Sequence, residues 1–273
     1  MRERKIFWAE LTTRDFESLD PDKTIAVLPI AATEQHGPHL PVMTDTAIAE
    51  GMIALLAKRL PPELSVLVLP IQAVGKSNEH LMSLGTLTLS AETLLRVLVE
   101  IGESVRRAGL RKLVLASSHG GNTSVIATAA RELRVQHGML AVATHWQWFG
   151  CPEGLYDTTE VRHGIHGGDI ETSLMLDLRP ELVRMDRAAN FVSAAVSIEQ
   201  EFSRLSADGT HAFGWIAQDL HPEGVVGNAA LATADKGART AEHQVAGFIE
   251  LLRDVSRFDL SRFHAKPQGA AAC

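Results

Sequence analysis

Apolar runs long enough for one strand alternate along this chain with longer segments of helical period. The run 24–30 is typical of a buried strand, and 45–60 follows it with an apolar stripe on one helical face. Strands that alternate with helices in this way form parallel sheets with both faces covered. We therefore predict an α/β fold with three α/β/α layers and a mostly parallel central sheet. The other predicted strands are 66–70, 112–117 and 139–144, and the other predicted helices are 91–108, 123–137, 169–178 and 238–255.

The alternation of strand and helix patterns becomes less regular after Gly150. Residues 181–227 show no clear period and contain several glycines, so we expect long loops there, with short strands or helical turns. No repeat or linker divides the sequence, and we predict one domain over residues 1–264. The tail 265–273 consists of small and polar residues, which predicts disorder.

Composition excludes several classes of function. The 273 residues carry a formal net charge of −7, which gives no indication of a basic face for nucleic acid. No stretch approaches the roughly 20 apolar residues of a membrane span. The two cysteines, Cys151 and Cys273, are too few for a disulfide framework, and we interpret Cys151 as a packed thiol. The residues after Met1 do not form an apolar signal region, so we expect a cytoplasmic protein.

Side chains that can bind a divalent metal ion follow the predicted strands at their carboxyl ends. The first strand leads into Glu34 and His36, and the third leads into His119 within the sequence His-Gly-Gly-Asn. Open parallel sheets bind ligands beyond the carboxyl ends of their strands, and glycines let the backbone approach a ligand closely. Carboxylates and imidazoles are typical ligands of catalytic metals. The candidates are Glu34, His36, Asp45, His119, His166 and Glu171.

Each candidate also has a purely structural interpretation. Asp45 alone is an ordinary helix N-cap, and Glu171 alone is a first-turn residue that the helix dipole favours. Asn122 alone can cap the helix that follows it. The position that the candidates share, at junctions between strand and helix, favours the functional interpretation.

Three motifs, in this order, resemble the creatininase family of metal-dependent amidohydrolases. They are Glu-Gln-His-Gly-Pro-His-Leu-Pro from Glu34 with Asp45, His-Gly-Gly-Asn from His119, and Gly-Gly-Asp-Ile-Glu-Thr-Ser from Gly167. The resemblance implies a creatininase-like fold, one or two divalent metal ions per chain, and a homo-oligomer, with a hexamer favoured. Zinc is the ion we expect first, with manganese or iron as alternatives.

The resemblance also implies roles for single residues. Asp45 matches the carboxylate that bridges two metal ions, and Glu34 matches a ligand of one of them. His36, His119 and Glu171 match the remaining ligands of the other ion. The other implied roles are proton transfer by His166, a role for Glu34 as a base if the second ion is absent, and substrate binding by His80, Trp146, Asn122 and Arg162.

Departures from creatininase itself bear on the substrate. Gly120 and Gly121 stand where creatininase has a tyrosine and a glutamate, and that glutamate is a ligand of the second metal. Arg162 replaces one tryptophan of the creatinine pocket, while Trp146 matches the other, either as an aromatic wall or in packing between subunits. We therefore do not expect creatinine to be the natural substrate.

We predict a metal-dependent hydrolase of a small or non-peptide amide C–N bond, such as a cyclic amide or a formamide. A metal-activated water attacks the carbonyl, and His166 carries a proton to the leaving nitrogen. The alternatives are a hydrolase or lyase of a keto-sugar and a peptidase of a cofactor-precursor peptide. A serine hydrolase using Ser117 or Ser118 lacks the Gly-x-Ser-x-Gly elbow. A binding protein with a vestigial site is a further alternative, because Gly121 replaces a ligand.

Overall fold

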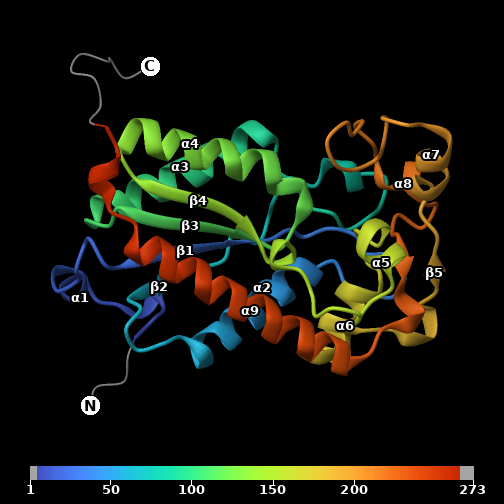
Figure 1. The fold of residues 1–273 in the computed structure, drawn as a ribbon, viewed down its shortest axis with the longest axis horizontal. Helices are drawn as coiled ribbons and strands as arrows, with labels where there is room; N and C mark the ends of the chain where they lie inside the picture. Colours follow the sequence, from blue (N-terminus) through green and yellow to red (C-terminus); the bar gives the residue numbers. More distant parts are fainter. Residues whose placement is uncertain (1–4, 265–273) are drawn as a thin grey trace.

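The central sheet has four parallel strands and lies between two layers of helices (Figure 1). This computed structural model describes residues 5–264. The predicted α/β fold with a parallel central sheet is confirmed. The strands are β1 (Ile25–Ile30), β2 (Val66–Val68), β3 (Lys112–Ser117) and β4 (Leu140–His145), in the spatial order β2-β1-β3-β4.

The register brings the carboxyl ends of three neighbouring strands to one level. Ile30 of β1 pairs with Ser117 of β3, and Ser117 pairs with His145 of β4. The loops that follow β1 and β3 therefore leave the sheet side by side, although they are far apart in the sequence.

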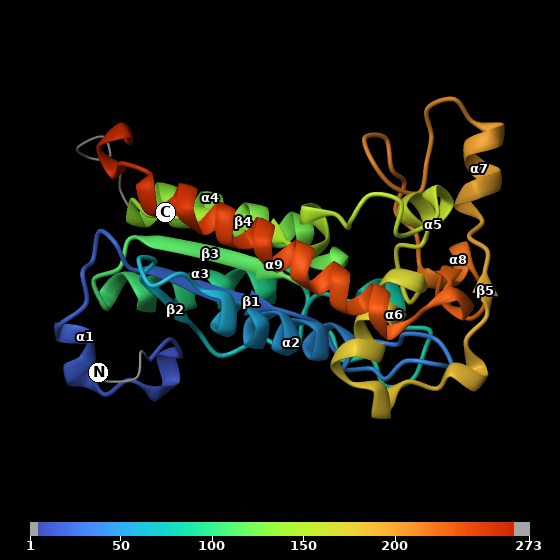
Figure 2. The same cartoon turned by 60° about the horizontal axis from the view of Figure 1, so that its bottom comes forward.

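Helices cover both faces of the sheet. They are α2 (Thr44–Arg59), α3 (Ala91–Arg107), α4 (Thr123–His137), α6 (Asp169–Leu178) and α9 (Ala234–Arg257). Ile25 and Val27 of β1 pack with α2, α6 and α9, whereas Ala26 and Leu28 pack with α3 and α4. Because successive side chains of a strand point to opposite faces, this fully buried strand needs a layer of helices on each side. The long helix α9 runs along the sheet (Figure 2).

Several boundaries differ from those predicted by one or two residues, and the start of α9 differs by four. β2 ends at Val68 rather than at residue 70, since Pro70 has no N–H group to offer a strand ladder. α9 begins at Ala234 rather than at residue 238, because the Thr233 hydroxyl accepts a hydrogen bond from the Lys236 N–H and caps the helix. The first turn of α9 has no large apolar residue, so the hydrophobic period alone does not reveal it.

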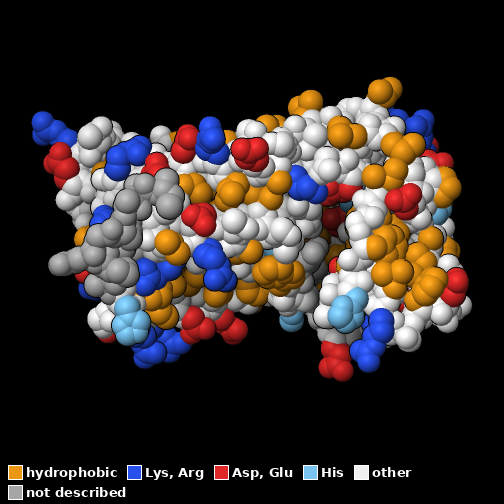
Figure 3. Space-filling model, turned by 90° about the horizontal axis from the view of Figure 1, so that it is seen from above, with side chains coloured by type: hydrophobic (Ala, Val, Ile, Leu, Met, Phe, Trp, Pro, Cys, Tyr) orange, Lys and Arg blue, Asp and Glu red, His pale blue; other side chains and the backbone are white. Residues whose placement is uncertain are grey.

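The segment between β4 and α9 lies largely beyond the carboxyl ends of the strands (Figure 1). It consists mainly of loops with short elements, as predicted for residues 181–227. Figure 3 shows a hollow between this segment and the sheet, with acidic side chains visible in it and apolar side chains gathered beside it. The short elements of the chain are α1 (Thr13–Glu17), α5 (Thr158–His163), α7 (Ala195–Glu201), α8 (Ala217–Leu220) and the antiparallel strands β5 (Asn190–Phe191) and β6 (Gly227–Asn228).

Within residues 5–264, no helix combines the length and the apolar character that crossing a membrane requires. The tail for which we predict disorder, 265–273, lies outside the described residues. One domain over residues 1–264 stays a prediction.

Candidate metal centre

Glu34, His36 and Asp45 meet where β1 ends and α2 begins. Glu34 and His36 lie on the loop after β1, and all three side chains are buried. Asp45 lies in the first turn of α2, while Met43 takes the N-cap position. The Asp45 carboxylate turns inward, where its Oδ2 atom lies 3.9 Å from Nε2 of His36. Asp45 therefore does not cap the helix.

His119 enters the cluster from the end of β3. Its Nδ1 atom lies 3.2 Å from Oε1 of Glu34 and 3.8 Å from Oδ2 of Asp45. On the other side of the ring, Nε2 lies 3.0 Å from the carbonyl oxygen of Lys76. A carbonyl oxygen only accepts hydrogen bonds, so the Nε2–H group donates to it. Nδ1 is then the nitrogen that can act as a ligand.

The loop before α6 brings in His166, and the first turn of α6 brings in Glu171. Oε2 of Glu171 lies 3.8 Å from Nε2 of His36, and Nδ1 of His166 lies 3.6 Å from Oε1 of Glu34. Gly167 has a φ angle of +68°, and its N–H donates a 2.6 Å hydrogen bond to Oε2 of Glu171. A residue with a Cβ atom is strained at this angle, so glycine makes the turn possible.

Three overlapping groups of ligand atoms can each surround one cation, and two of them share Asp45. Within each group the atoms lie within 4.8 Å of one another. The resemblance implies that His119 shares an ion with His36 and Glu171, but the structure groups His119 with Glu34 instead. The groups are Glu34, Asp45 and His119; His36, Asp45 and Glu171; and Glu34, His36 and His166.

Several buried ligand atoms of the cluster have no hydrogen-bond partner among residues 5–264. They are both carboxylate oxygens of Glu34, Nε2 of His36 and Oδ2 of Asp45. Nδ1 of His36 lies 3.1 Å from the Glu34 carbonyl oxygen, so its N–H is on that side and the Nε2 lone pair faces the carboxylates. Buried polar atoms without partners are costly. Lone pairs and carboxylates that face one another fit a bound cation.

The pKa values of the clustered groups also fit a site for a cation. Burial, with Glu34 adding to it, raises the pKa of Asp45 well above its ordinary value, and burial raises the pKa of Glu171. Burial lowers the pKa of His119, but the carboxylates of Glu34, Asp45 and Glu79 together outweigh burial and raise this pKa to about 10. The metal-free cluster therefore holds protons, and divalent cations take their place because metal ligands must be deprotonated.

His80 also reaches the cluster, from a 3₁₀ turn at Asn78–His80. Its Nε2 atom lies 3.4 Å from Oε1 of Glu34. The ring of His166 lies between those of His36 and His80, with centroid distances of 4.2 and 4.3 Å. Burial lowers the pKa of His80 to about 2 and that of His166 to about 4, so both rings are neutral at pH 7.

Gly121 leaves room for a carboxylate that we did not single out from the sequence, that of Glu79. A Cβ atom at Gly121 would lie 2.1 Å from Oε1 of Glu79, 2.4 Å from Nε2 of His119 and 2.7 Å from the Lys76 carbonyl oxygen. Glu79 lies 3.7 Å from Nε2 of His119 and pairs with Nζ of Lys76 at 2.8 Å. A side chain at position 121 would force these neighbours to move, and Gly121 itself offers no ligand to the centre. The signal that could have found Glu79 is its place directly before His80.

Trp146 lies in the hydrophobic core, which differs from its predicted place in a substrate pocket. Its side chain is 2% exposed, and its ring packs against that of Phe248 with centroids 4.6 Å apart. Its neighbour Trp148 is exposed and packs against the ring of His145. Trp146 belongs to η4, the 3₁₀ turn Trp146–Phe149. This turn lies against α9, so the Trp146 ring reaches the core beside Phe248.

Arg162 and Asn122 also make contacts other than those predicted for substrate-binding residues. The Arg162 side chain is 67% exposed, and its guanidinium donates two hydrogen bonds to the Glu199 carboxylate, at 2.8 and 2.9 Å. The buried amide of Asn122 accepts a hydrogen bond from the Lys76 N–H and donates one to the Ala31 carbonyl oxygen. Asn122 thus fastens loops of the site to each other.

The structure gives no support for a serine or cysteine nucleophile. Ser117 Oγ donates to the His119 carbonyl oxygen at 2.9 Å, and Ser118 Oγ donates to the Asp45 carbonyl oxygen at 2.8 Å. Burial raises the pKa of the Cys151 thiol, which is the opposite of activation.

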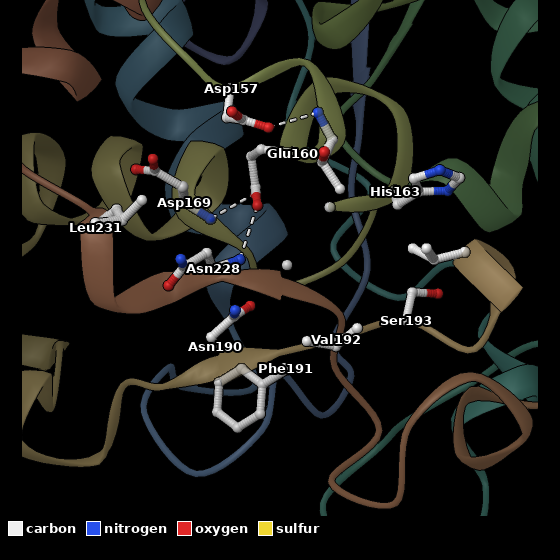
Figure 4. A pocket seen from close by; sticks show the side chains of 14 residues that line it. Asp157, Glu160, His163, Asp169, Asn190, Phe191, Val192, Ser193, Asn228 and Leu231 are labelled. Carbon is white, nitrogen blue, oxygen red and sulfur yellow. Dashed lines mark hydrogen bonds between the residues drawn. The ribbon is translucent and has the colours of Figure 1, made fainter.

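A cavity of about 340 Å³ lies beside the loop before α6, between α5 and the β5–β6 pair (Figure 4). None of the clustered ligand residues lines it. Glu160 in its wall accepts hydrogen bonds from the N–H groups of Asp169 at 2.6 Å and Asn228 at 2.7 Å (Figure 4). Glu160 thereby ties α5 to the start of α6, and so holds the end of the loop that carries His166 and the helical turn that carries Glu171. The sequence did not reveal this role of Glu160. Its partners are backbone N–H groups elsewhere in the chain, and such contacts leave no local sequence pattern.

The family model described as creatinine amidohydrolase matches residues 9–252, a span that includes the whole cluster. The chain belongs to the creatininase family. Among curated proteins, the mycofactocin precursor peptide peptidase of Mycobacterium ulcerans (strain Agy99) is 32% identical over 266 residues, which are 95% of this chain and 94% of that protein.

Solved structures of creatininase share the fold. The structure of creatininase with manganese has a TM-score of 0.75 and 25% identity, over 93% of this chain and 100% of that chain. A creatininase variant of the zinc type has a TM-score of 0.74 and 25% identity, over 94% and 100% of the two chains. This chain is thus a metal-dependent amidohydrolase of the creatininase family. Its carboxylates and imidazoles suit zinc, manganese or iron as the divalent cofactor.

Proposed function

We propose that this chain hydrolyses an amide C–N bond with divalent ions held in two groups that share Asp45. The observation that carries the proposal is the position of Asp45, whose Oδ2 atom lies 3.8 Å from Nδ1 of His119 and 3.9 Å from Nε2 of His36. Glu34 completes the first group and Glu171 completes the second. A carboxylate between two cation positions is the arrangement that two-metal hydrolases use.

When bound, the metal supplies an acidified water and polarises the carbonyl of the substrate. His166 is suited to move the proton, because its Nε2 atom lies 2.9 Å from the Gln35 carbonyl oxygen and its Nδ1 atom faces Glu34. A neutral imidazole with a free lone pair at the cluster can accept a proton and deliver it to the leaving nitrogen. Glu34 serves as a ligand in this arrangement.

A cyclic amide or a formamide is the first substrate class to test. Creatinine is not the expected substrate, because Trp146 is packed in the core and Arg162 is paired with Glu199. Neither side chain forms the wall of a pocket for a flat ring at the cluster.

A peptide amide in a precursor peptide is the second candidate. It is supported by the 32% identity to the mycofactocin precursor peptide peptidase over nearly the whole chain. The apolar side chains of Leu81, Met82 and Leu84 follow His80 directly and are exposed, with Leu84 at 99%. Apolar side chains beside a catalytic cluster suit a peptide better than a small polar amide.

The test begins with removal of the metal by a chelator and reloading with zinc, manganese or iron(II) in separate samples. We expect hydrolysis of a cyclic amide, a formamide or a short apolar peptide to stop on removal and to return with at least one ion. Hydrolysis that continues after complete removal would contradict the proposal. In heavy-oxygen water, hydrolysis places solvent oxygen in the product, whereas a lyase reaction on a keto-sugar does not.

We also propose a homo-oligomer, with a hexamer favoured, and a cytoplasmic location. Light scattering of the purified protein tests the first point, because a mass near 29.6 kDa would mean a monomer. Fractionation of the producing cells tests the second.

A further inference from the structure

We propose that Gln35 is a positioning residue that fixes the hydrogen positions of two histidines, so that His80 presents an N–H group to Glu34 and His166 presents a lone pair. This inference deepens the proposed function and rests on it only for the role of Glu34 as a metal ligand. The His80 ring is then the hydrogen-bond donor toward Glu34, and the His166 ring is the acceptor.

The orientation of the Gln35 side-chain amide is set by two backbone groups. Its Oε1 atom accepts a 2.9 Å hydrogen bond from the N–H of Gly37. Its Nε2 atom donates a 2.5 Å hydrogen bond to the carbonyl oxygen of Gly224. If the amide were turned over, an NH₂ group would face an N–H donor and a carbonyl would face a carbonyl. The buried side chain therefore has one acceptable orientation.

The second hydrogen of the Gln35 amide goes to His80. Nε2 of Gln35 lies 2.8 Å from Nδ1 of His80, and an amide nitrogen can only donate. Nδ1 of His80 must accept, so the ring proton of the neutral imidazole sits on Nε2. The Nε2 atom that carries this proton lies 3.4 Å from Oε1 of Glu34. Without a lone pair at Nε2, His80 is kept out of the metal ligands.

Because both hydrogens of the Gln35 amide are used, the ring proton of His166 is placed differently with respect to Glu34. Nε2 of His166 lies 3.2 Å from Nε2 of Gln35, but both hydrogens of that amide are already donated. Nε2 of His166 also lies 2.9 Å from the Gln35 carbonyl oxygen, to which it donates its own proton. Nδ1 of His166 then carries the lone pair, and it faces Oε1 of Glu34 at 3.6 Å.

The test is ¹⁵N NMR of histidine-labelled protein, recorded both metal-free and loaded with zinc, with the His80 signals identified by their absence in the His80→Gln variant. In the wild type we expect the proton of His80 on Nε2 and an unprotonated Nδ1. In Gln35→Glu the carboxylate cannot donate, so we expect Nδ1 of His80 to become protonated. We also expect kcat to fall by about 10- to 100-fold, which is typical for residues that orient a metal site.

The matched control is Gln244→Glu. Gln244 is also a buried glutamine that donates to a carbonyl oxygen, that of Gly150, but it has no contact with the cluster. This variant should leave the histidine signals of the cluster unchanged. If Gln35 had a merely structural role, Gln35→Glu would behave like Gln244→Glu. It would lower stability without changing which nitrogen of His80 is protonated.

A wild-type spectrum with the proton on Nδ1 of His80 would overturn the inference, whether or not the variants fold. So would a folded Gln35→Glu variant that keeps Nδ1 of His80 unprotonated. If the expected pattern appears but no amide is hydrolysed, the inference stands and the proposed function fails. If hydrolysis is found with the wrong pattern, the proposed function stands and the inference fails.

Discussion

Nδ1 of His119 lies 3.2 Å from Oε1 of Glu34, while Nε2 on the opposite edge of the ring contacts the Lys76 carbonyl oxygen at 3.0 Å. This imidazole therefore has one edge fixed by backbone and the other directed at a buried carboxylate. In the metal-free protein a proton lies on the inner edge, and a bound metal ion would replace it. The affinity for metal and the stability of the metal-free protein should depend on pH in opposite ways.

The stability of the metal-free protein should fall as pH rises above neutrality. Burial lowers the pKa of His119, but the nearby carboxylates, Glu34 foremost, outweigh burial and raise the folded-state value from 6.5 to about 10. The favourable contact is fully present below pH 6.5 and is lost as pH rises through 10. Urea denaturation between pH 6.5 and 10 measures the effect, and His119→Gln should reduce the slope. A stability that rises over this range would contradict the assignment.

Metal affinity should increase with pH over the same range, because the ion must displace the proton on His119. Isothermal titration calorimetry of zinc binding in buffers of different ionisation enthalpy gives the number of protons released. We expect a net release at pH 7. Equal binding enthalpies in all buffers would show that no proton leaves.

Asp45→Asn should remove metal from both groups, whereas Glu171→Gln should affect only the group that contains His36. An asparagine oxygen is a weaker ligand and cannot bridge two cations as a carboxylate does. We expect activity to fall by more than about 100-fold in Asp45→Asn, beyond the usual loss from residues outside the ligand set. Metal analysis of the purified variants checks the difference, and equal metal content in the two would count against a shared ligand.

The metal-free form of Asp45→Asn should be more stable than the metal-free wild type. Burial raises the pKa of Asp45 well above its ordinary value, so ionising this carboxyl without a cation is costly. Thermal unfolding in the presence of a chelator provides the comparison.

Gly121→Ala should destabilise the protein and weaken metal binding, because the new Cβ atom would lie 2.1 Å from Oε1 of Glu79 and 2.4 Å from Nε2 of His119. Forced contacts of this kind typically cost about 1–3 kcal/mol. Gly120→Ala is the matched control, since a Cβ atom there meets nothing within 4 Å. Equal unfolding free energies and zinc affinities for the two variants would disprove the crowding at position 121.

Glu160→Gln should lower stability by about 1–3 kcal/mol, because an amide NH₂ group would replace an oxygen that accepts from a backbone N–H. The change should also lower activity by loosening the loop that carries His166. Glu199→Gln is the control, since its partner Arg162 is exposed and such pairs contribute about 0–1 kcal/mol. Urea denaturation and amide hydrolysis are measured for both variants.

Much of the fold and most residues of the candidate metal centre could be predicted because their signals are local. Alternating periods identify β1, β3 and the helices around them, since burial on both faces requires continuous apolar strands. Residue type and position after a strand identify Glu34, His36 and His119. The motifs that resemble the creatininase family add Asp45 and Glu171 as ligands. The sequence alone was thus enough to determine the layered architecture and the chemical class of the centre.

The tertiary structure decided which of these side chains meet and how they are oriented. His119 joins Glu34 rather than His36, Trp146 enters the core, and Arg162 turns to Glu199. Each outcome depends on the direction of a side chain and on partners far away in the chain. The links made by Gln35 and Glu160 have the same origin, because their hydrogen bonds exist only after loops from different strands have packed together.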